Sequence, residues 1–341
     1  MNAPARILLA LAFTHAVAAA APSAAAADGL PASGVDASPV SAPGGSVEYL
    51  TRRAARGQGA RRATLVVARE RGSERVLRRL RLPGTLSVPA VAYDGSASGL
   101  SADGRTLVLI NPRRTFPRGV TTFAVLDAKR LGPRRVLRLE GDFSFDAISP
   151  DGGLIYLIQY VSRRNPDRYA VRAYDLRARR LLSEPVVDPR EGSEPMNGFP
   201  VTRAGSPDGR WAYTLYDGAD HPFIHALDTE RRQAVCIDLH SLASRRRGLW
   251  GLRLEVGPGG GSPLTVEAGN RVLASVDTRT FRVTERRGAA RRSAETEDEA
   301  AAVPWLLVGP GAGAAVLLLA AVAALGGGRR GRGAAAQTSS E

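Results

Sequence analysis

Short apolar runs, separated by turn-forming residues, recur along most of this chain. Between residues 46 and 287 the runs are about four to eight residues long, rich in β-branched residues, and bounded by clusters of glycine, proline, aspartate and asparagine. No long window shows the 3.6-residue period of an amphipathic helix, whereas short β-branched runs between turn residues are typical of strands. The pattern therefore predicts an all-β fold for this part of the chain.

A tight turn followed by an apolar strand occurs three times, in Leu100–Asn111, Ile148–Gln159 and Ala204–Gly218. Each copy contains the sequence Ser-x-Asp-Gly before its apolar run. Aspartate in such a turn bonds to the local backbone and glycine supplies a positive φ. Each copy therefore predicts a hairpin turn and no ligand of its own.

A second motif, an apolar strand that ends in aspartate, occurs four times. Its aspartates are Asp127, Asp175, Asp228 and Asp277, which are separated by 48, 53 and 49 residues. A period near 50 with four strands in each unit is the signature of a β-propeller, whose blades are four-stranded antiparallel sheets. Four units are predicted to start near Leu86, Phe143, Phe199 and Leu249.

The number of blades depends on the chain before Leu86. Residues 64–68 and 75–80 predict the two outer strands of a further unit, and residues 47–50 supply a first strand for it. We predict a propeller of four to five four-stranded blades, with five favoured. Four blades and an extra hairpin are the alternative.

The two motifs together resemble the repeat of the TolB-type and YVTN-type propellers, which are distant relatives of the WD-repeat propellers. The resemblance covers about residues 64–287. It implies the propeller fold, but it selects no function, because such propellers are mostly binding platforms, with lyases, lactonases and peptidase-associated domains among them.

The amino-terminal residues predict export. Residues 1–27 combine Arg6, an apolar centre too short to span a bilayer, and Ala25-Ala26-Ala27 as a cleavage site, which is the pattern of a secretory signal peptide. Residues 28–45 consist mainly of proline, serine, glycine and alanine, and predict a disordered linker before the propeller of residues 46–287.

The carboxyl-terminal residues predict a membrane anchor. Residues 305–325 carry no charge and are long enough to span about 30 Å of hydrocarbon as one transmembrane helix. They follow a charged juxtamembrane stalk, residues 288–304, and precede an arginine-rich tail, residues 326–341, which marks the cytoplasmic side. The predicted localisation is the cell membrane, with a single span, the amino-terminal ectodomain outside and the carboxyl terminus in the cytoplasm.

Charge and cysteine content limit the partners. The 341 residues carry a formal net charge of +14, nearly all of it from arginine, because Lys129 is the only lysine. This charge attracts anionic surfaces in a salt-dependent way, but an exported domain does not ordinarily meet nucleic acid, so we expect no nucleic-acid partner. With Cys236 as the single cysteine, no internal disulfide is possible.

The long loops of the predicted propeller all fall on one of its faces. Strands alternate in direction, so the loops between second and third strands share a face with the connections between blades. Here those loops are long, whereas the Asp-Gly turns of the opposite face are short. Because binding residues concentrate on loops carried by a rigid scaffold, we expect the site on the long-loop face. Simple solvation of strand ends is the alternative for its polar residues, which are Asn111, Gln159, Tyr160, Asn197, Tyr216, Asp217 and His221.

No catalytic constellation is predicted. The Asp-Gly turns lack the alternating ligands of a calcium loop, and His221, His225 and His240 are too few and at the wrong spacing for a convincing zinc site. There is no nucleophile elbow, no His-Glu-x-x-His and no phosphate loop. We therefore expect no metal and no cofactor, and we expect His225 to be a packed, hydrogen-bonded core histidine and not a catalytic residue.

Two functions follow from these expectations. The leading hypothesis is a membrane-anchored extracytoplasmic platform, more a binding protein than an enzyme, for a bacterial envelope protein, peptide or glycan. The alternative is a propeller hydrolase or lyase with its site at the axial mouth of the long-loop face, where Asp217 and His221 would act as acid and base.

Overall fold

The computed structural model describes residues 38–54, 62–191 and 195–285. The chain divides into two compact units, residues 1–287 and 288–341, and the second lies entirely outside the described residues. The predicted signal peptide, stalk, membrane helix and tail lie outside them too. In the described part of the chain, no helix combines the length and the apolarity that crossing a membrane requires.

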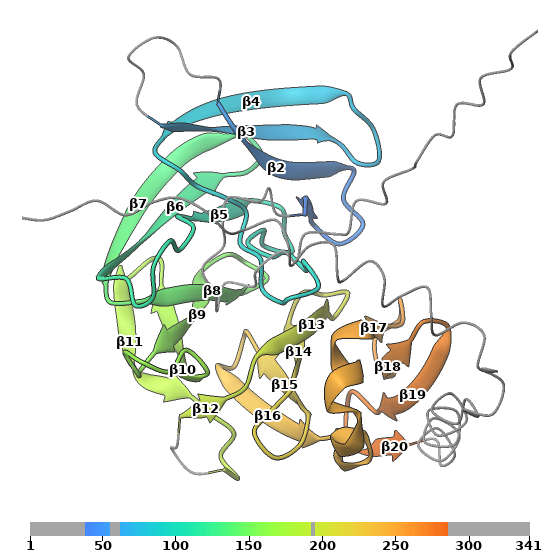
Figure 1. Ribbon diagram of the computed structural model, residues 1–341. Helices are drawn as coiled ribbons and strands as arrows, with labels where there is room; N and C mark the ends of the chain where they lie inside the picture. The colour runs from blue at the N-terminus through green and yellow to red at the C-terminus, as the bar shows by residue number, and fades with distance from the viewer. Residues whose placement is uncertain (1–37, 55–61, 192–194, 286–341) are drawn as a thin grey trace, which may run out of the picture. The chain divides into compact units, whose positions relative to one another are not determined.

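The described residues form five antiparallel sheets, in which strands pair in chain order (Figure 1). The first contains β1 (Val40–Ser41), β2 (Val47–Arg53), β3 (Ala63–Glu70) and β4 (Val76–Pro83), and the second contains β5 (Thr106–Ile110), β6 (Val120–Asp127) and β7 (Gly132–Glu140). The third contains β8 (Phe143–Ile148), β9 (Leu154–Tyr160), β10 (Arg168–Asp175) and β11 (Arg180–Val186), with β12 (Met196–Asn197) paired to β10. The fourth contains β13 (Pro200–Gly205), β14 (Trp211–Tyr216), β15 (Phe223–Asp228) and β16 (Gln233–Asp238), and the fifth contains β17 (Leu252–Val256), β18 (Leu264–Ala268), β19 (Arg271–Val276) and β20 (Val283–Glu285).

The all-β prediction is confirmed, and each sheet has the meander order of a propeller blade. The turn motif explains why the strands start where they do. In all three copies the aspartate accepts hydrogen bonds from the serine hydroxyl and from the backbone N–H two residues later, as in Ser149-Pro150-Asp151-Gly152. The serine oxygen in turn accepts the N–H that opens the next strand. The aspartates therefore have their predicted role in turns.

The first sheet begins earlier than the composition predicts. Val40 pairs with Tyr49, is only 6% exposed, and lies within residues 28–45, which were expected to be a disordered linker. The hydroxyl of Tyr49 donates to the carbonyl of Ala128 in the second sheet. Residues 40–41 therefore form a strand inside the range that was expected to be a linker, and residues 28–37 of that range lie outside the described residues.

The second sheet differs from the predicted unit that starts near Leu86. Where a first strand was expected, only isolated bridges pair Ser87 with Ile110 and Leu100 with Leu107. Gly99 has a φ of +117°, and a Cβ there would lie 2.6 Å from the carbonyl oxygen of Val108. This close approach of two backbones requires glycine and interrupts a regular strand.

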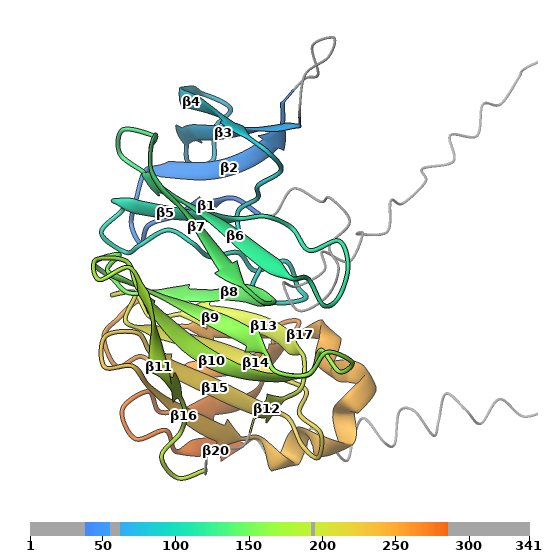
Figure 2. The same cartoon turned by 90° about the vertical axis from the view of Figure 1, so that its left-hand side faces the viewer.

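Apolar side chains between successive sheets form the core. One cluster joins β2 and β3 to β5 and β6, a second joins β5 and β6 to β8 and β9, and a third joins β9 and β10 to β14 and β15. The second of these buries Phe123, Phe143 and Phe145, each at most 2% exposed. Figure 2 shows these sheets following one another in chain order. Each of the first four sheets therefore buries apolar side chains against its neighbours.

Gly209 provides a test of how closely the Asp-Gly turns pack. A Cβ at Gly209, whose φ is +74°, would lie 2.4 Å from the Cβ of Ala102 in the turn before β5. Gly72 has nearly the same φ, +72°, with nothing within 4 Å. We expect Gly209→Ala to lower the free energy of unfolding by about 1–3 kcal/mol more than Gly72→Ala does, because only the first adds overpacking to backbone strain. Urea denaturation of the two variants measures the difference, and equal losses would show that the turns do not meet.

Candidate functional site

The alternating strands place two sets of loops at opposite ends of the sheets. We call the loop face the end that carries the loops between second and third strands and the connections between sheets. It includes residues 111–119, 161–167 and 217–222 and the connections 187–199 and 239–251, of which residues 192–194 are not described. The connection 239–251 contains a 3-10 helix, η1 (His240–Gly251), where the sequence predicted a loop.

Aromatic side chains from three connections pack together on the loop face. Tyr93 makes edge contacts with Phe199 and Trp250, at ring-centroid distances of 5.9 and 5.0 Å. Asp94 beside it accepts a hydrogen bond from the hydroxyl of Thr202 at 2.6 Å. These contacts hold the connections together, so this part of the loop face is filled by side chains.

A buried ion pair holds the loop between β5 and β6. The guanidinium of Arg113 donates to the carboxylate of Asp142 at 2.6–3.0 Å, and both side chains are 2% exposed. The backbone N–H of Arg118 donates to the same carboxylate at 2.9 Å. Arg113 also lies over the ring of Tyr160, 4.5 Å from its centroid, which is a cation–π contact.

The predicted site residues separate into three groups. Tyr160 and Tyr216 line a small cavity of about 20 Å³, together with Asp146 and Tyr169. Tyr216 is 2% exposed, and burial raises the pKa of its hydroxyl and that of Tyr169. These two predicted residues therefore face a small space between side chains rather than the wider pocket of this face.

The side chains of three more predicted residues accept hydrogen bonds within the protein. The side-chain oxygen of Asn111 accepts the N–H of Thr122 at 2.8 Å, and that of Gln159 accepts a bond from Arg172 at 2.6 Å. Oδ1 of Asp217 accepts the N–H of Phe199 at 2.6 Å. Each of these contacts stabilises a loop or a strand end, and whether any of the three also binds a ligand stays a prediction.

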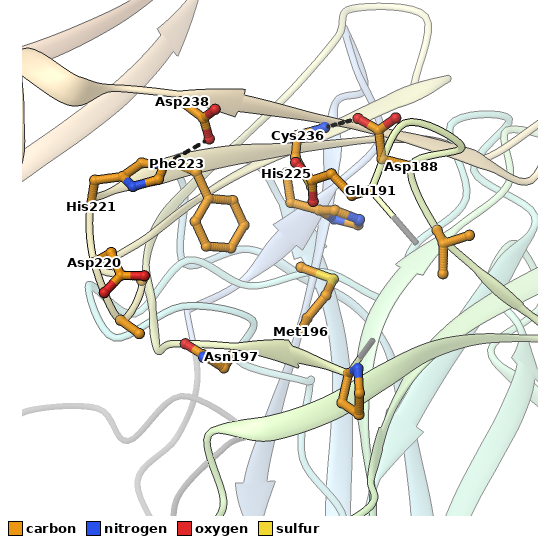
Figure 3. A pocket seen from close by; sticks show the side chains of 14 residues that line it. Asp188, Glu191, Met196, Asn197, Asp220, His221, Phe223, His225, Cys236 and Asp238 are labelled. Atoms are coloured by element: carbon orange, nitrogen blue, oxygen red, sulfur yellow. Dashed lines mark hydrogen bonds and ion pairs between the residues drawn. The ribbon is translucent and has the colours of Figure 1, made fainter. Parts of the chain in front are cut away.

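The remaining two, Asn197 and His221, line a pocket of about 630 Å³ on the loop face (Figure 3). The connection after β11 forms one wall, the loop 217–222 forms another, and β15 and β16 supply the rest. Gly218 sets the course of that loop: its φ is +60°, and a Cβ there would lie 2.0 Å from the carbonyl oxygen of His221. The volume is in the range of small-ligand pockets.

The lining of this pocket is acidic and apolar. Its carboxylates are Asp188, Glu191, Asp220 and Asp238, and its apolar side chains include Val187, Pro195, Met196 and Phe223. Among the described residues of the lining there is no lysine or arginine, although the chain has a net charge of +14. The lining of the pocket is therefore acidic, whereas the protein as a whole is positively charged.

The carboxylate of Asp188 already accepts hydrogen bonds from neighbouring residues. It accepts hydrogen bonds from the guanidinium and the backbone of Arg190 and from the backbone N–H of Cys236. Burial raises the pKa of Asp188, but these hydrogen bonds outweigh it and lower the pKa to about 2. Burial, with nearby carboxylates, raises the pKa of the Cys236 thiol, so both groups are poor candidates for chemistry at neutral pH.

His225 occupies the floor of the pocket. It lies on β15 opposite Cys236, is 2% exposed, and its Nε2 has no hydrogen-bond partner among the described residues. Burial lowers its pKa to about 4. It is therefore packed in the core as predicted, but the described residues give its Nε2 no hydrogen bond. It is neutral at pH 7.

His221 meets two residues that the sequence interpretation did not join to it. Its Nε2 lies 2.9 Å from Oδ1 of Asp238, and its ring centroid lies 4.5 Å from that of His240. The ladder of β15 and β16 pairs Phe223 with Asp238, and extending this register places His221 opposite His240. This register can be deduced from the hairpin turn after Asp228. The sequence alone could therefore have predicted that His221 lies opposite His240.

A second pocket, of about 610 Å³, lies at the opposite end of the third and fourth sheets. Its lining mixes Asp151, Asp175 and Glu230 with three arginines. Asp151 and Asp175 accept backbone hydrogen bonds within their own turns, and Asp151 also pairs with Arg177 at 3.1 Å. These groups serve the turns, so we take the loop-face pocket as the candidate site.

Comparison with known proteins gives remote likenesses only. No family model matches the chain, and no curated protein matches it. Among solved structures it is similar to hydrazine synthase of Kuenenia stuttgartiensis, at 15% identity and a TM-score of 0.39, covering 73% of this chain and 70% of that one. It is similar to a putative TolB from Agrobacterium tumefaciens, at 14% identity and a TM-score of 0.40, covering 74% and 80%. It is also similar to the β-propeller domain of Cps50 (Swd1) from Myceliophteria thermophila, at 12% identity and a TM-score of 0.44, covering 74% and 72%. At these scores nothing of those proteins' activities or ligands transfers to this chain.

Proposed function

We propose that this protein is a membrane-anchored, extracytoplasmic β-propeller of five blades, which binds a polypeptide of the cell envelope through the loop-face pocket. The five meander sheets support the fold. The export signal of residues 1–27 and the apolar run of residues 305–325 support the location. In this proposal the five sheets are the blades of one propeller, and its loop face is the working face.

The charge of the pocket supports a cationic ligand group. On a chain of net charge +14, the described part of the pocket lining contains four carboxylates and no lysine or arginine. Asp188 is paired with Arg190. The carboxylates of Glu191 and Asp220 are exposed and would face a ligand, and Glu191 also accepts a hydrogen bond from the Cys236 thiol. Met196 and Phe223 lie beside them (Figure 3). An arginine or lysine side chain matches this lining, because its apolar stem packs on such surfaces while its charged head reaches carboxylates.

Among an envelope protein, a peptide and a glycan, this lining favours a polypeptide with a basic side chain. A selection from a library of random displayed peptides, with the full-length protein in detergent as the target, tests this choice. We expect the selected peptides to share an arginine or lysine. Replacing that residue by glutamine is expected to weaken binding about tenfold or more, since charge-assisted hydrogen bonds contribute about 1.5–3 kcal/mol.

Pocket variants connect the binding to the site. Glu191→Gln and Asp220→Asn remove charge from the pocket without changing side-chain size, and we expect each to weaken binding of the selected peptide severalfold. Glu230→Gln is the matched control, because Glu230 lies after β15 at the opposite end of the fourth sheet and is half exposed. Peptides without a basic residue, or equal affinity for all three variants, would overturn the proposal.

The alternative function, a hydrolase or lyase, has one contact in its favour. His221 lies against Asp238 at 2.9 Å, and a carboxylate that orients an imidazole is typical of a general base. The carboxylate differs from the expected one, because Asp217 instead accepts the N–H of Phe199. Turnover of any peptide or glycan substrate that is lost in His221→Ala would favour the enzyme over the platform.

A further inference from the structure

Three side chains with metal-binding atoms meet at the rim of the pocket. One ligand atom each from His221, Asp238 and His240 lies within 4.8 Å of the other two. Nε2 of His221 and Oδ1 of Asp238 are 2.9 Å apart. Two ligands of a tetrahedral zinc ion with bonds of about 2.0 Å are about 3.3 Å apart. This pair is therefore already near the spacing that a metal ion requires.

The backbone under these side chains is fixed on both sides. Asp238 ends β16, and the N–H of Leu239 donates to the carbonyl of Pro222 at 2.9 Å, which extends the ladder beyond the last strand pair. Leu239 and Leu242 are buried, at 0% and 3% exposure, and hold the start of η1. Asp238 and His240 are exposed and His221 is partly exposed, so the side chains can rotate onto an ion while the backbone stays in place.

We propose that His221, Asp238 and His240 bind a divalent transition-metal ion, with zinc as the physiological metal. Two imidazoles and one carboxylate suit zinc and its first-row neighbours and are a poor match for calcium or magnesium, which take oxygen ligands. Three protein ligands leave a coordination position open. Because His221 and Asp238 line the pocket, that position is at the pocket's rim, where a donor atom of a bound molecule can reach it.

A second group of possible ligands in the same pocket is a weaker candidate. Asp188, Glu191 and Cys236 also lie within 4.8 Å of one another. Oxygen atoms of Asp188 already accept hydrogen bonds from Arg190 and Cys236, and a metal would have to displace them. The Cys236 side would also need a thiolate, whose formation the burial of that thiol opposes.

Zinc titration of the full-length protein tests the site directly. The protein is purified without a histidine tag, treated with a chelator, and titrated with zinc chloride in a calorimeter. We expect one zinc ion per chain, and a loss of affinity of at least tenfold in His240→Ala, whose exposed side chain leaves the fold intact. Asp220→Asn and Cys236→Ser are the controls, and both should bind zinc like the unaltered protein.

Cobalt identifies the ligands by spectroscopy. Bound to the proposed residues, Co²⁺ should give visible ligand-field bands without a thiolate charge-transfer band, and His240→Ala should lose those bands. A thiolate band that disappears in Cys236→Ser would assign the ion to the second group and overturn the proposal. Zinc binding that is absent at tens of micromolar, or that persists in His240→Ala, would overturn it too. Neither titration includes a peptide, so the proposal stands or falls independently of the proposed function.

Discussion

Asp142→Asn is expected to lower the free energy of unfolding by about 3–5 kcal/mol, the largest effect of any single substitution considered for this protein. The carboxylate of Asp142 accepts hydrogen bonds from the guanidinium of Arg113 and from the backbone of Arg118, and the Arg113 and Asp142 side chains are both 2% exposed. An amide in its place removes the carboxylate charge that faces the buried guanidinium of Arg113. Denaturation in urea, with the free energy taken from midpoint and slope, measures the loss.

Glu70→Gln is the matched control, because it makes the same chemical change in an exposed pair. Glu70 lies 3.8 Å from Arg75, with both side chains at least 47% exposed. Surface pairs of this kind contribute below about 1 kcal/mol, so the control should unfold almost like the unaltered protein. If Asp142→Asn cost no more than Glu70→Gln, the buried pair would not hold the loop as described.

Acid should destabilise the protein through His225 by about 3 kcal/mol between neutral pH and pH 4. Burial lowers the pKa of His225 from the usual 6.5 to about 4 in the folded protein. Between those two values the unfolded chain takes up a proton that the folded protein does not, so the stability falls as the pH falls. Above pH 6.5 the residue is neutral in both states and contributes no pH dependence.

Unfolding free energies measured at several pH values, for the unaltered protein and for His225→Gln, isolate this contribution. Glutamine does not titrate, so the difference between the two free-energy curves should change with a slope of about 1.4 kcal/mol per pH unit, which corresponds to one proton, between pH 4 and 6.5. Parallel curves for the unaltered protein and His225→Gln would mean that His225 is hydrated or paired in the fold.

Local turn chemistry explains why so much of the fold could be predicted. Ser-x-Asp-Gly is a self-contained hydrogen-bonded unit, so it specifies a turn wherever it occurs, and the strand after it follows from the apolar run. The unit expected near Phe143 begins at that residue, and those expected near Phe199 and Leu249 begin at Pro200 and Leu252. The repeat spacing then orders the strands into sheets without any knowledge of long-range contacts.

Features that depend on distant contacts were not predictable in this way. β1 forms because Val40 is buried against other parts of the chain, and nothing within residues 28–45 signals that. Tyr216 looked like a polar strand end, but its ring stacks on Phe223 at 5.3 Å and faces a small cavity beside Tyr169. Whether a polar residue at a strand end faces solvent or a neighbouring sheet is decided by packing between sheets.

The candidate site could be predicted only in part. His221 was predicted from its loop, and Asn197 from the length of its connection, and the structure places both in one pocket. The acidic lining and the approach of His240 were missed, because they bring together two loops and the ends of β15 and β16. The hairpin register would have placed His221 opposite His240, but it cannot show that His221 and Glu191 line the same pocket.

The central claim, that the loop-face pocket is the binding site, is tested most directly by amide hydrogen exchange of the full-length protein with and without the selected basic peptide. Binding there predicts slower exchange in residues 187–191, 195–197 and 218–222, which form the pocket walls, and unchanged exchange in the Asp-Gly turns at residues 103–104, 151–152 and 208–209. Protection confined to those turns, or no change at saturating peptide, would contradict the claim.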